Sequence, residues 1–148
     1  DLYAKALSRD YLATGKARMA WVTFAFMGDE STNAAKAGFC ALDQDPEAFW
    51  TLHDWMFENQ ADVANTGAFS AERLAQMADR VGLDVEAFET CLADPATLQR
   101  VEDGKAFAVE SGVESTPSFL VGETLVAGTG EANLATLRQA LDQAAGGE

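Results

Sequence analysis

Two cysteines carry the most reactive side chains of this sequence. Cys40 and Cys91 lie far apart, each in a stretch with helical periodicity, so they form no C-x-x-C motif. Three interpretations are open from the residues alone. The pair could form a disulfide, closing a loop of about 50 residues and adding about 4 kcal/mol of stability. It could be two buried thiols packed as small apolar groups, or it could bind zinc together with His53.

His53 is the single histidine of the chain and therefore a candidate general base. Its neighbours one helical turn away on either side are Phe49 and Phe57, so we expect the ring to face a core and to hydrogen-bond locally. As a zinc ligand it would complete a set of three at most, without the local spacing that zinc sites show. Acidic pairs such as Asp43 and Asp45 fit exposed helix caps better than a catalytic carboxylate pair.

The junction Ser115-Thr116-Pro117 is the third candidate, because a helical stretch ends at Gly112 and an apolar strand follows Pro117 directly. Proline has no N–H and disfavours helical conformation in the residue before it, so we expect Thr116 to be extended and Pro117 to open the strand. Local chemistry gives the cis isomer a prior of only about 5–6%. The junction is nevertheless the predicted functional edge of the protein.

Composition limits the classes of partner. The chain has 148 residues, 48% of them hydrophobic, which suits one domain with a substantial core and room for an insertion. Its formal charge of −14 repels phosphate backbones and anionic membrane surfaces, so we exclude nucleic acid as a partner. The longest apolar run, Met19 to Met27, is the length of a strand, and we expect no membrane insertion of this segment.

The first thirty residues predict a helix and a strand. Tyr3, Leu7 and Tyr11 recur at a spacing of four residues, which indicates a helix over 2–12 that stops at Gly15. Residues 17–26 are apolar on both faces and rich in β-formers, which is typical of a strand buried on both sides of a sheet.

The middle of the chain is predicted to be entirely helical. Ser31 is expected to cap a helix over 34–42, and further helices are expected to begin at Asp45-Pro46, Ser70, Asp84 and Asp94-Pro95. Residues 119–121 and 124–126 then predict a tight hairpin, and leucines in phase predict a closing helix. We therefore expect residues 1–30 with 112–148 to form one part, and residues 31–111 a helical insertion.

These segments together resemble a known family. The stretch from Gly112 to Gly128, with Ser115-Thr116-Pro117-Ser118 inside it, resembles the DsbA-like branch of thioredoxin-fold thiol–disulfide oxidoreductases. Residues 37–60 and 82–92 are similar to the two halves of that family's helical domain. The resemblance covers essentially the whole chain. It implies an α/β, thioredoxin-like fold with an all-helical insertion domain.

The resemblance also implies roles for the candidate residues. In the family a cis-proline loop, here Thr116-Pro117 with Ser115, pairs its backbone with the extended segment around a substrate cysteine. Some relatives carry a disulfide between cysteines of the helical domain, which favours a structural disulfide between Cys40 and Cys91. No metal and no cofactor are implied. The implied partners are cysteine-containing proteins and a redox partner protein, in the periplasm or another extracytoplasmic compartment.

The sequence departs from the family at its reactive centre. The family's nucleophile is the first cysteine of a C-x-x-C motif at the start of a helix, and this chain has no such motif. The strand that precedes the motif has no counterpart either, and Asp1 is not an initiator methionine. We therefore expect these residues to be the C-terminal part of a longer polypeptide.

Three functions follow as hypotheses. The first is a DsbA-type oxidoreductase acting on exported proteins, with this chain supplying the cis-proline loop but no catalytic residue. The second is a redox-inactive, thioredoxin-like module that holds peptides or a partner at the same edge. The third is an enzyme similar to the kappa glutathione transferases and isomerases, against which the Ser-Thr-Pro-Ser-Phe sequence and the paired cysteines argue.

Overall fold

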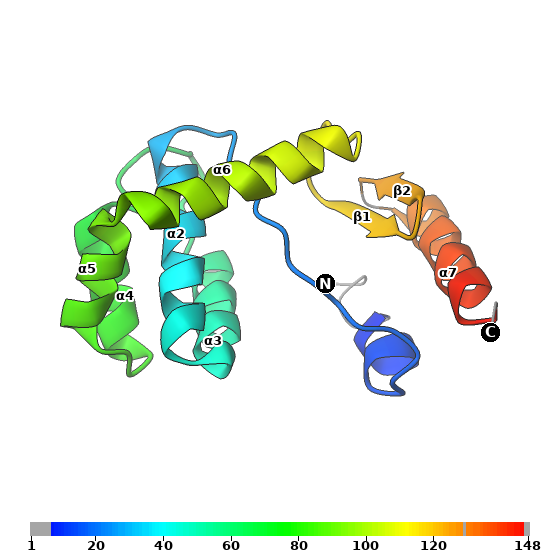
Figure 1. The fold of residues 1–148 in the computed structure, drawn as a ribbon, viewed down its shortest axis with the longest axis horizontal. Helices are drawn as coiled ribbons and strands as arrows, with labels where there is room; N and C mark the ends of the chain where they lie inside the picture. The colour runs from blue at the N-terminus through cyan, green and yellow to red at the C-terminus, as the bar shows by residue number, and fades with distance from the viewer. Residues whose placement is uncertain (1–6, 129, 147–148) are drawn as a thin grey trace. The chain divides into compact units, whose positions relative to one another are not determined.

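The computed structural model describes residues 7–128 and 130–146. Their order along the chain is a short π-helix, five α-helices, a two-stranded sheet and a last α-helix (Figure 1). The elements are η1 Ser8–Leu12, α2 Asp29–Gln44, α3 Pro46–Glu58, α4 Ala71–Arg80, α5 Val85–Ala93, α6 Pro95–Glu110, β1 Ser118–Val121, β2 Thr124–Ala127 and α7 Glu131–Ala145.

The chain divides into two compact units, each described by itself below. The terminal unit comprises Asp1–Val22 and Phe107–Glu148, and the helical unit comprises Thr23–Ala106. The sequence-based division into residues 1–30 with 112–148 and an insertion over 31–111 stays a prediction, because compactness does not by itself assign a unit to a fold.

Local capping chemistry sets the helix starts of the helical unit. The side chains of Asp45, Ser70 and Asp84 each accept a hydrogen bond from a backbone N–H in the first turn of α3, α4 and α5. Pro46 occupies the first turn of α3, where its missing N–H has no partner to lose. These three predicted starts are confirmed.

The start of α2 differs from the expectation. We expected Ser31 to cap a helix over 34–42, whereas α2 begins at Asp29 with Gly28 as its N-cap. Gly28 has a φ of 95°, a conformation that glycine adopts without strain, and Asp29 and Glu30 place negative charge at the positive end of the helix dipole. These features start the helix one turn early, so Ser31 lies inside it.

The core of the helical unit is formed by α2, α3, α4 and α5. Helix α2 contacts each of the other three helices, and α4 also packs against α3 and α5. Small residues of α2 allow this close packing, and larger side chains fill the space between the helices. The buried cluster comprises Ala37, Cys40, Ala41, Leu52, Leu74, Met77, Ala78, Phe88 and Leu92.

The predicted strand over 17–26 is wrong. These residues have no regular structure, and Met19 and Trp21 are 49% and 48% exposed. A strand requires a hydrogen-bonding neighbour, and in the part of the chain that the structure describes β1 pairs with β2 alone. Thr23 lies instead close to Gly104 of α6. A side chain at Gly104 would place its Cβ atom 2.5 Å from the Thr23 Oγ1, so only glycine leaves room for this contact.

The predicted hairpin is confirmed in the terminal unit. Strands β1 and β2 are antiparallel, with Ser118 opposite Ala127 and Val121 opposite Thr124. Helix α7 contacts both strands, and its buried Leu137 packs with Val126 of β2. The helix expected over 2–12 lies partly outside the described residues, and the described part forms η1.

A hydrogen bond fastens η1 to α7 within the terminal unit. The Tyr11 hydroxyl donates to the Asp142 Oδ1 at 3.0 Å, and only 6% of Tyr11 is exposed. Burial first, then the hydrogen bond and the charge of Asp142, raise the pKa of Tyr11.

Tyr11→Phe is expected to lower the free energy of unfolding of the terminal unit by about 1 kcal/mol at pH 7. Since the folded pKa is raised, the stability that the neutral hydroxyl contributes is complete below the unfolded pKa of about 10 and is lost as pH rises through the folded pKa. Urea titrations of both proteins between pH 7 and 11 test this. A difference between them that does not shrink above pH 10 would contradict the assignment.

Candidate functional site

The predicted functional edge lies between α6 and β1. Helix α6 is followed by Gly112, whose φ of 80° reverses the chain, and the Val113 N–H donates to the Ala108 carbonyl at 2.9 Å. The chain then continues through Ser115, and the Thr116–Pro117 peptide bond is cis. The turn chemistry of glycine and proline therefore places an exposed loop directly before the sheet.

Two hydrogen bonds hold this loop on the hairpin. The Gly128 N–H donates to the Pro117 carbonyl at 2.7 Å, which extends the β1–β2 ladder by one pair. The Ser118 hydroxyl donates to the Ser115 carbonyl at 2.6 Å. Ser115, Thr116 and Pro117 are all exposed, and within the described residues nothing hydrogen-bonds to the backbone of Thr116.

The loop can therefore present main-chain groups to a ligand. An exposed N–H and C=O beside a sheet offer an extended peptide the same hydrogen bonds that a further strand would make. The loop contains no cysteine and no histidine. The structure thus brings Ser115, Thr116 and Pro117 together as one exposed segment.

The two cysteines form a disulfide in the helical unit. Cys40 of α2 and Cys91 of α5 are joined with an S–S distance of 2.03 Å and a Cα–Cα distance of 5.7 Å. The alternatives of two free thiols and of a zinc site with His53 are therefore wrong. The disulfide joins α2 to α5, with Cys40 in the buried cluster and Cys91 partly buried at its edge.

His53 lies on α3 in aromatic surroundings, as its neighbours predicted. Its ring centroid is 5.9 Å from that of Phe49 and 4.8 Å from that of Phe57. Its Nδ1 lies 2.9 Å from the Asp54 Oδ1, and 16% of the side chain is exposed. These contacts place the ring among aromatic side chains with a hydrogen-bond partner next to it in the chain.

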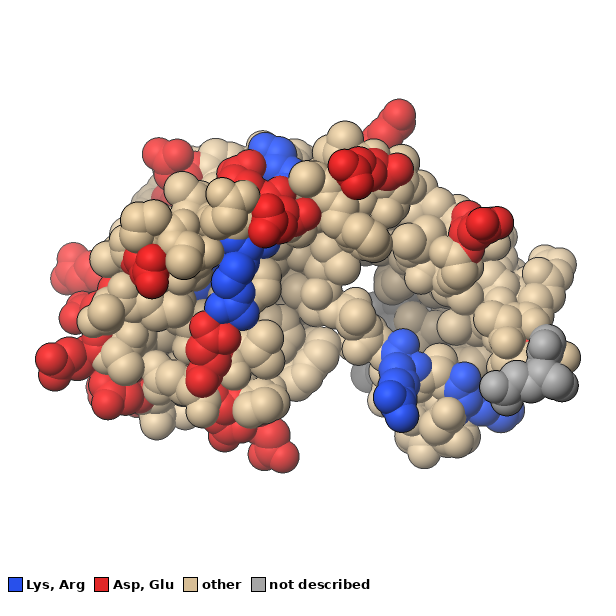
Figure 2. Space-filling view, viewed as in Figure 1, with Lys and Arg blue, Asp and Glu red and all other residues tan. Residues whose placement is uncertain are grey.

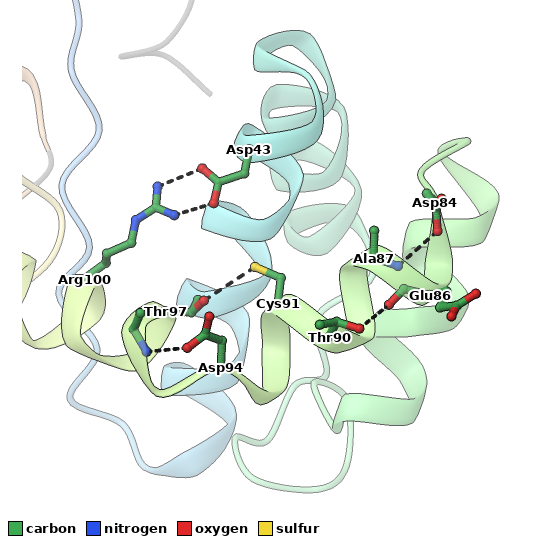
Figure 3. Close-up of a pocket in the computed structure, with 10 residues that line it drawn as sticks. Asp43, Asp84, Glu86, Ala87, Thr90, Cys91, Asp94, Thr97 and Arg100 are labelled. Atoms are coloured by element: carbon green, nitrogen blue, oxygen red, sulfur yellow. Dashed lines mark hydrogen bonds and ion pairs between the residues drawn. The ribbon is translucent and has the colours of Figure 1, made fainter.

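The structure also shows a feature that the sequence did not predict. An open cavity lies beside Cys91, and Thr97 and Arg100 of α6 line it (Figure 3). Arg100 forms a two-point ion pair with Asp43, which is 57 residues away, so no local pattern could have found it. Among residues 7–128 and 130–146 no group of three or more His, Cys, Asp or Glu side chains is arranged to hold a metal ion.

Comparisons with known proteins give relatives over most of the chain. The chain is 37% identical over 103 residues to a Na⁺/H⁺ antiporter NhaA from Herminiimonas arsenicoxydans, a match that covers 70% of this chain and 15% of the antiporter. It is 26% identical to a probable disulfide bond formation protein D from Bacillus anthracis, over 93% of this chain and 62% of that protein. The chain thus spans less than two thirds of the length of these relatives.

Two solved structures resemble the fold. The crystal structure of oxidised BdbD from Bacillus subtilis matches 97% of this chain and 76% of its own, with a TM-score of 0.83 and 20% identity. A thioredoxin-like oxidoreductase from Silicibacter pomeroyi matches 85% of this chain and 67% of its own, with a TM-score of 0.65 and 27% identity. The predicted thioredoxin-like fold with its helical insertion is confirmed by these likenesses.

A sequence profile described as thioredoxin matches residues 2–143, nearly the whole chain. Together with the relatives named for disulfide bond formation, this match confirms the resemblance stated from the sequence. The chain belongs to the thioredoxin family.

Proposed function

We propose that the protein containing this chain is a thiol–disulfide oxidoreductase of the DsbA type, acting on exported proteins. The observation that carries the proposal is the 26% identity to a probable disulfide bond formation protein D over 93% of the chain. The exchange proceeds through a mixed disulfide and needs a reactive cysteine. The two cysteines of this chain are bonded to each other, so the proposal requires a C-x-x-C motif outside residues 1–148.

This chain contributes the binding edge of the site. Thr116 would offer its backbone N–H and C=O to the extended segment around a substrate cysteine, while Ser115 and Pro117 fix the course of the loop. Support comes from the exposure of these residues and from the two hydrogen bonds that hold the loop on β1 and β2. Main-chain pairing is tolerant of sequence, which suits an enzyme with many substrates.

The partners and the compartment follow from the same chemistry. The substrates are proteins with cysteines, and a redox partner protein restores the oxidation state after each turnover. The Cys40–Cys91 disulfide supports a periplasmic or other extracytoplasmic location, because structural disulfides persist in oxidising compartments. No helix in the described part of the chain is long and apolar enough to cross a membrane.

The test is the reduction of insulin by the full-length protein in the presence of dithiothreitol. We expect precipitation of the insulin B chain to be faster than with dithiothreitol alone. A protein with an intact far-ultraviolet circular dichroism spectrum and no acceleration would overturn the proposal. That result, combined with peptide binding, would favour the second function, a redox-inactive module that holds peptides.

Peptide binding is measured separately. An extended peptide with an S-methylated cysteine is expected to shift the amide resonances of Ser115, Thr116 and Ser118 in a ¹H–¹⁵N correlation spectrum. The matched control is the same peptide with an N-methyl group on the pairing residue, which removes one main-chain donor and leaves the protein unchanged. We expect the control to bind about 2- to 10-fold more weakly, since one hydrogen bond contributes about 0.5–1.5 kcal/mol. Equal binding would exclude main-chain pairing.

A further inference from the structure

The two cysteines of the disulfide differ in how deeply they are buried. Cys40 is 1% exposed and lies within the buried cluster of the helical unit. Cys91 is only partly buried, and it lines an open cavity of about 620 Å³ (Figure 3). Thiol–disulfide exchange requires direct contact between the attacking sulfur and the sulfur attacked. Of the two residues, only Cys91 is reached by solvent to an appreciable extent.

The sulfurs also differ in their hydrogen bonding. The Thr97 hydroxyl is 3.5 Å from the Cys91 Sγ, and it donates because a disulfide sulfur carries no proton. Thr97 is 4% exposed, so this hydroxyl is held in place by its surroundings. Within the described residues no hydrogen bond reaches the Cys40 Sγ. The same hydroxyl could donate to a thiolate at Cys91, whereas in the described part of the chain no such donor lies at Cys40.

The side chains that line the cavity carry mostly negative charge. Asp43, Asp84, Glu86 and Asp94 contribute four carboxylates, against the single guanidinium of Arg100. Arg100 is already bound to Asp43 by two hydrogen bonds, of 2.5 and 3.1 Å. Figure 2 shows acidic side chains spread widely over the visible face of the helical unit. The cavity therefore favours cationic molecules and repels anionic ones.

We propose that Cys91 is the reactive sulfur of this pair, and that the disulfide forms and breaks through a mixed disulfide on Cys91 with a cationic thiol or disulfide compound. In formation, the Cys91 thiolate attacks an external disulfide: a new S–S bond joins Cys91 to one external half, the external S–S bond breaks, and the other half leaves as a thiolate. Cys40 then attacks the Cys91 Sγ, and the remaining external half leaves as a thiol that carries the Cys40 proton.

These two reaction steps balance. The two protein thiols together lose two electrons and two protons, and one external disulfide gains them and becomes two thiols. Breaking the bond follows the same path in reverse, so an external thiolate also attacks Cys91. The alternative path through Cys40 would require a reagent to enter the core among Leu52, Leu74 and Phe88.

The first experiment compares single-thiol variants under native conditions. Cys40→Ala leaves Cys91 free, and Cys91→Ala leaves Cys40 free. Each is treated with 2-aminoethyl methanethiosulfonate, and each rate is divided by the rate for the same variant unfolded in urea. We expect the normalised rate of Cys91 to exceed that of Cys40 about tenfold or more. Equal rates, or a faster Cys40, overturn the proposal.

A measurement on the unsubstituted chain covers the case in which either variant fails to fold. The reduced protein is mixed with cystamine and quenched with acid at short times, and the mixed disulfide is located by mass spectrometry of its peptides. We expect the aminoethylthio group on Cys91. Its accumulation on Cys40 overturns the proposal.

The second experiment tests the charge preference at Cys91. In Cys40→Ala, the rates of the cationic 2-aminoethyl and the anionic 2-sulfonatoethyl methanethiosulfonate are each divided by the rate for the unfolded variant. We expect the normalised rate of the cationic reagent to be several-fold higher than that of the anionic reagent. We expect the ratio of the two rates to be smaller at high salt, which screens the charges. Glu86→Gln is expected to reduce the ratio roughly twofold. The matched control is Glu89→Gln on the same helix, because Glu89 does not line this cavity. A ratio near one, or equal effects of the two substitutions, overturns the charge preference.

Discussion

Replacing Cys40 and Cys91 together by alanine is expected to lower the free energy of unfolding of the helical unit by about 4 kcal/mol. The two residues are 51 positions apart, and a cross-link of that span removes about this much free energy by restricting the unfolded chain. Urea titration followed by far-ultraviolet circular dichroism measures the loss. The folded unit keeps its other contacts between α2 and α5, so we expect the same helical content before unfolding.

Reduced wild-type protein is the control for this variant. It lacks the cross-link and keeps both sulfur atoms, so its difference from the double variant reports only the packing of the side chains. We expect reduced protein and double variant to agree within about 1.5 kcal/mol, since one buried atom is removed at Cys40. A total loss below about 1 kcal/mol would show that the closed loop is not what stabilises the unit.

The starts of α3, α4 and α5 and the hairpin could be predicted from the sequence because their causes are local. An aspartate or serine before a helix satisfies a backbone N–H that lies two or three residues away, as at Asp45 and Ser70. Gly122 has the positive φ that a tight hairpin turn requires, and it sits between two short apolar runs. Each feature is decided within a few residues, so the chain itself displays it.

The segment over 17–26 could not be predicted in the same way. Its apolar pattern indicates a preference for burial and for extended structure, but strand formation depends on a partner elsewhere. In the described structure the sheet consists of β1 and β2 and does not include this segment, and Trp21 is 48% exposed. The composition of the segment therefore identified the character of its side chains and not the hydrogen bonds of its backbone.

In the candidate sites, too, features decided by neighbouring residues could be predicted and contacts between distant residues could not. Local chemistry predicts that the helix ends before Pro117, whereas the cis isomer of the Thr116–Pro117 bond and the pairing of Cys40 with Cys91 were favoured only by the family resemblance. The contact of Thr97 with Cys91 and the ion pair of Arg100 with Asp43 depend on how α5 and α6 meet and how α6 meets α2. Such contacts are products of packing, and no spacing in the sequence encodes them.

The spacing of apolar residues does not show which of them are buried in the folded protein. A matched pair of leucines tests the burial that the structure shows. Leu52 of α3 is 0% exposed within the buried cluster, whereas Leu98 of α6 is 41% exposed, although both lie on faces with apolar periodicity. Leu52→Ala is expected to lower the free energy of unfolding of the helical unit by about 3–5 kcal/mol, because it removes apolar contacts and leaves a cavity. Leu98→Ala is expected to lower it by less than about 1 kcal/mol, since water already reaches that side chain.

Both substitutions remove the same atoms from a helix, so differences in helix propensity cancel between them. The free energies are compared by urea titration of the disulfide-bonded proteins, with the slope of the transition checked for equality. Equal losses at the two positions would contradict the packing described for α3 and α6. A large loss of unfolding free energy for Leu98→Ala alone would show that Leu98 is buried in a contact. The core of the helical unit would then include the face of α6 that carries Leu98.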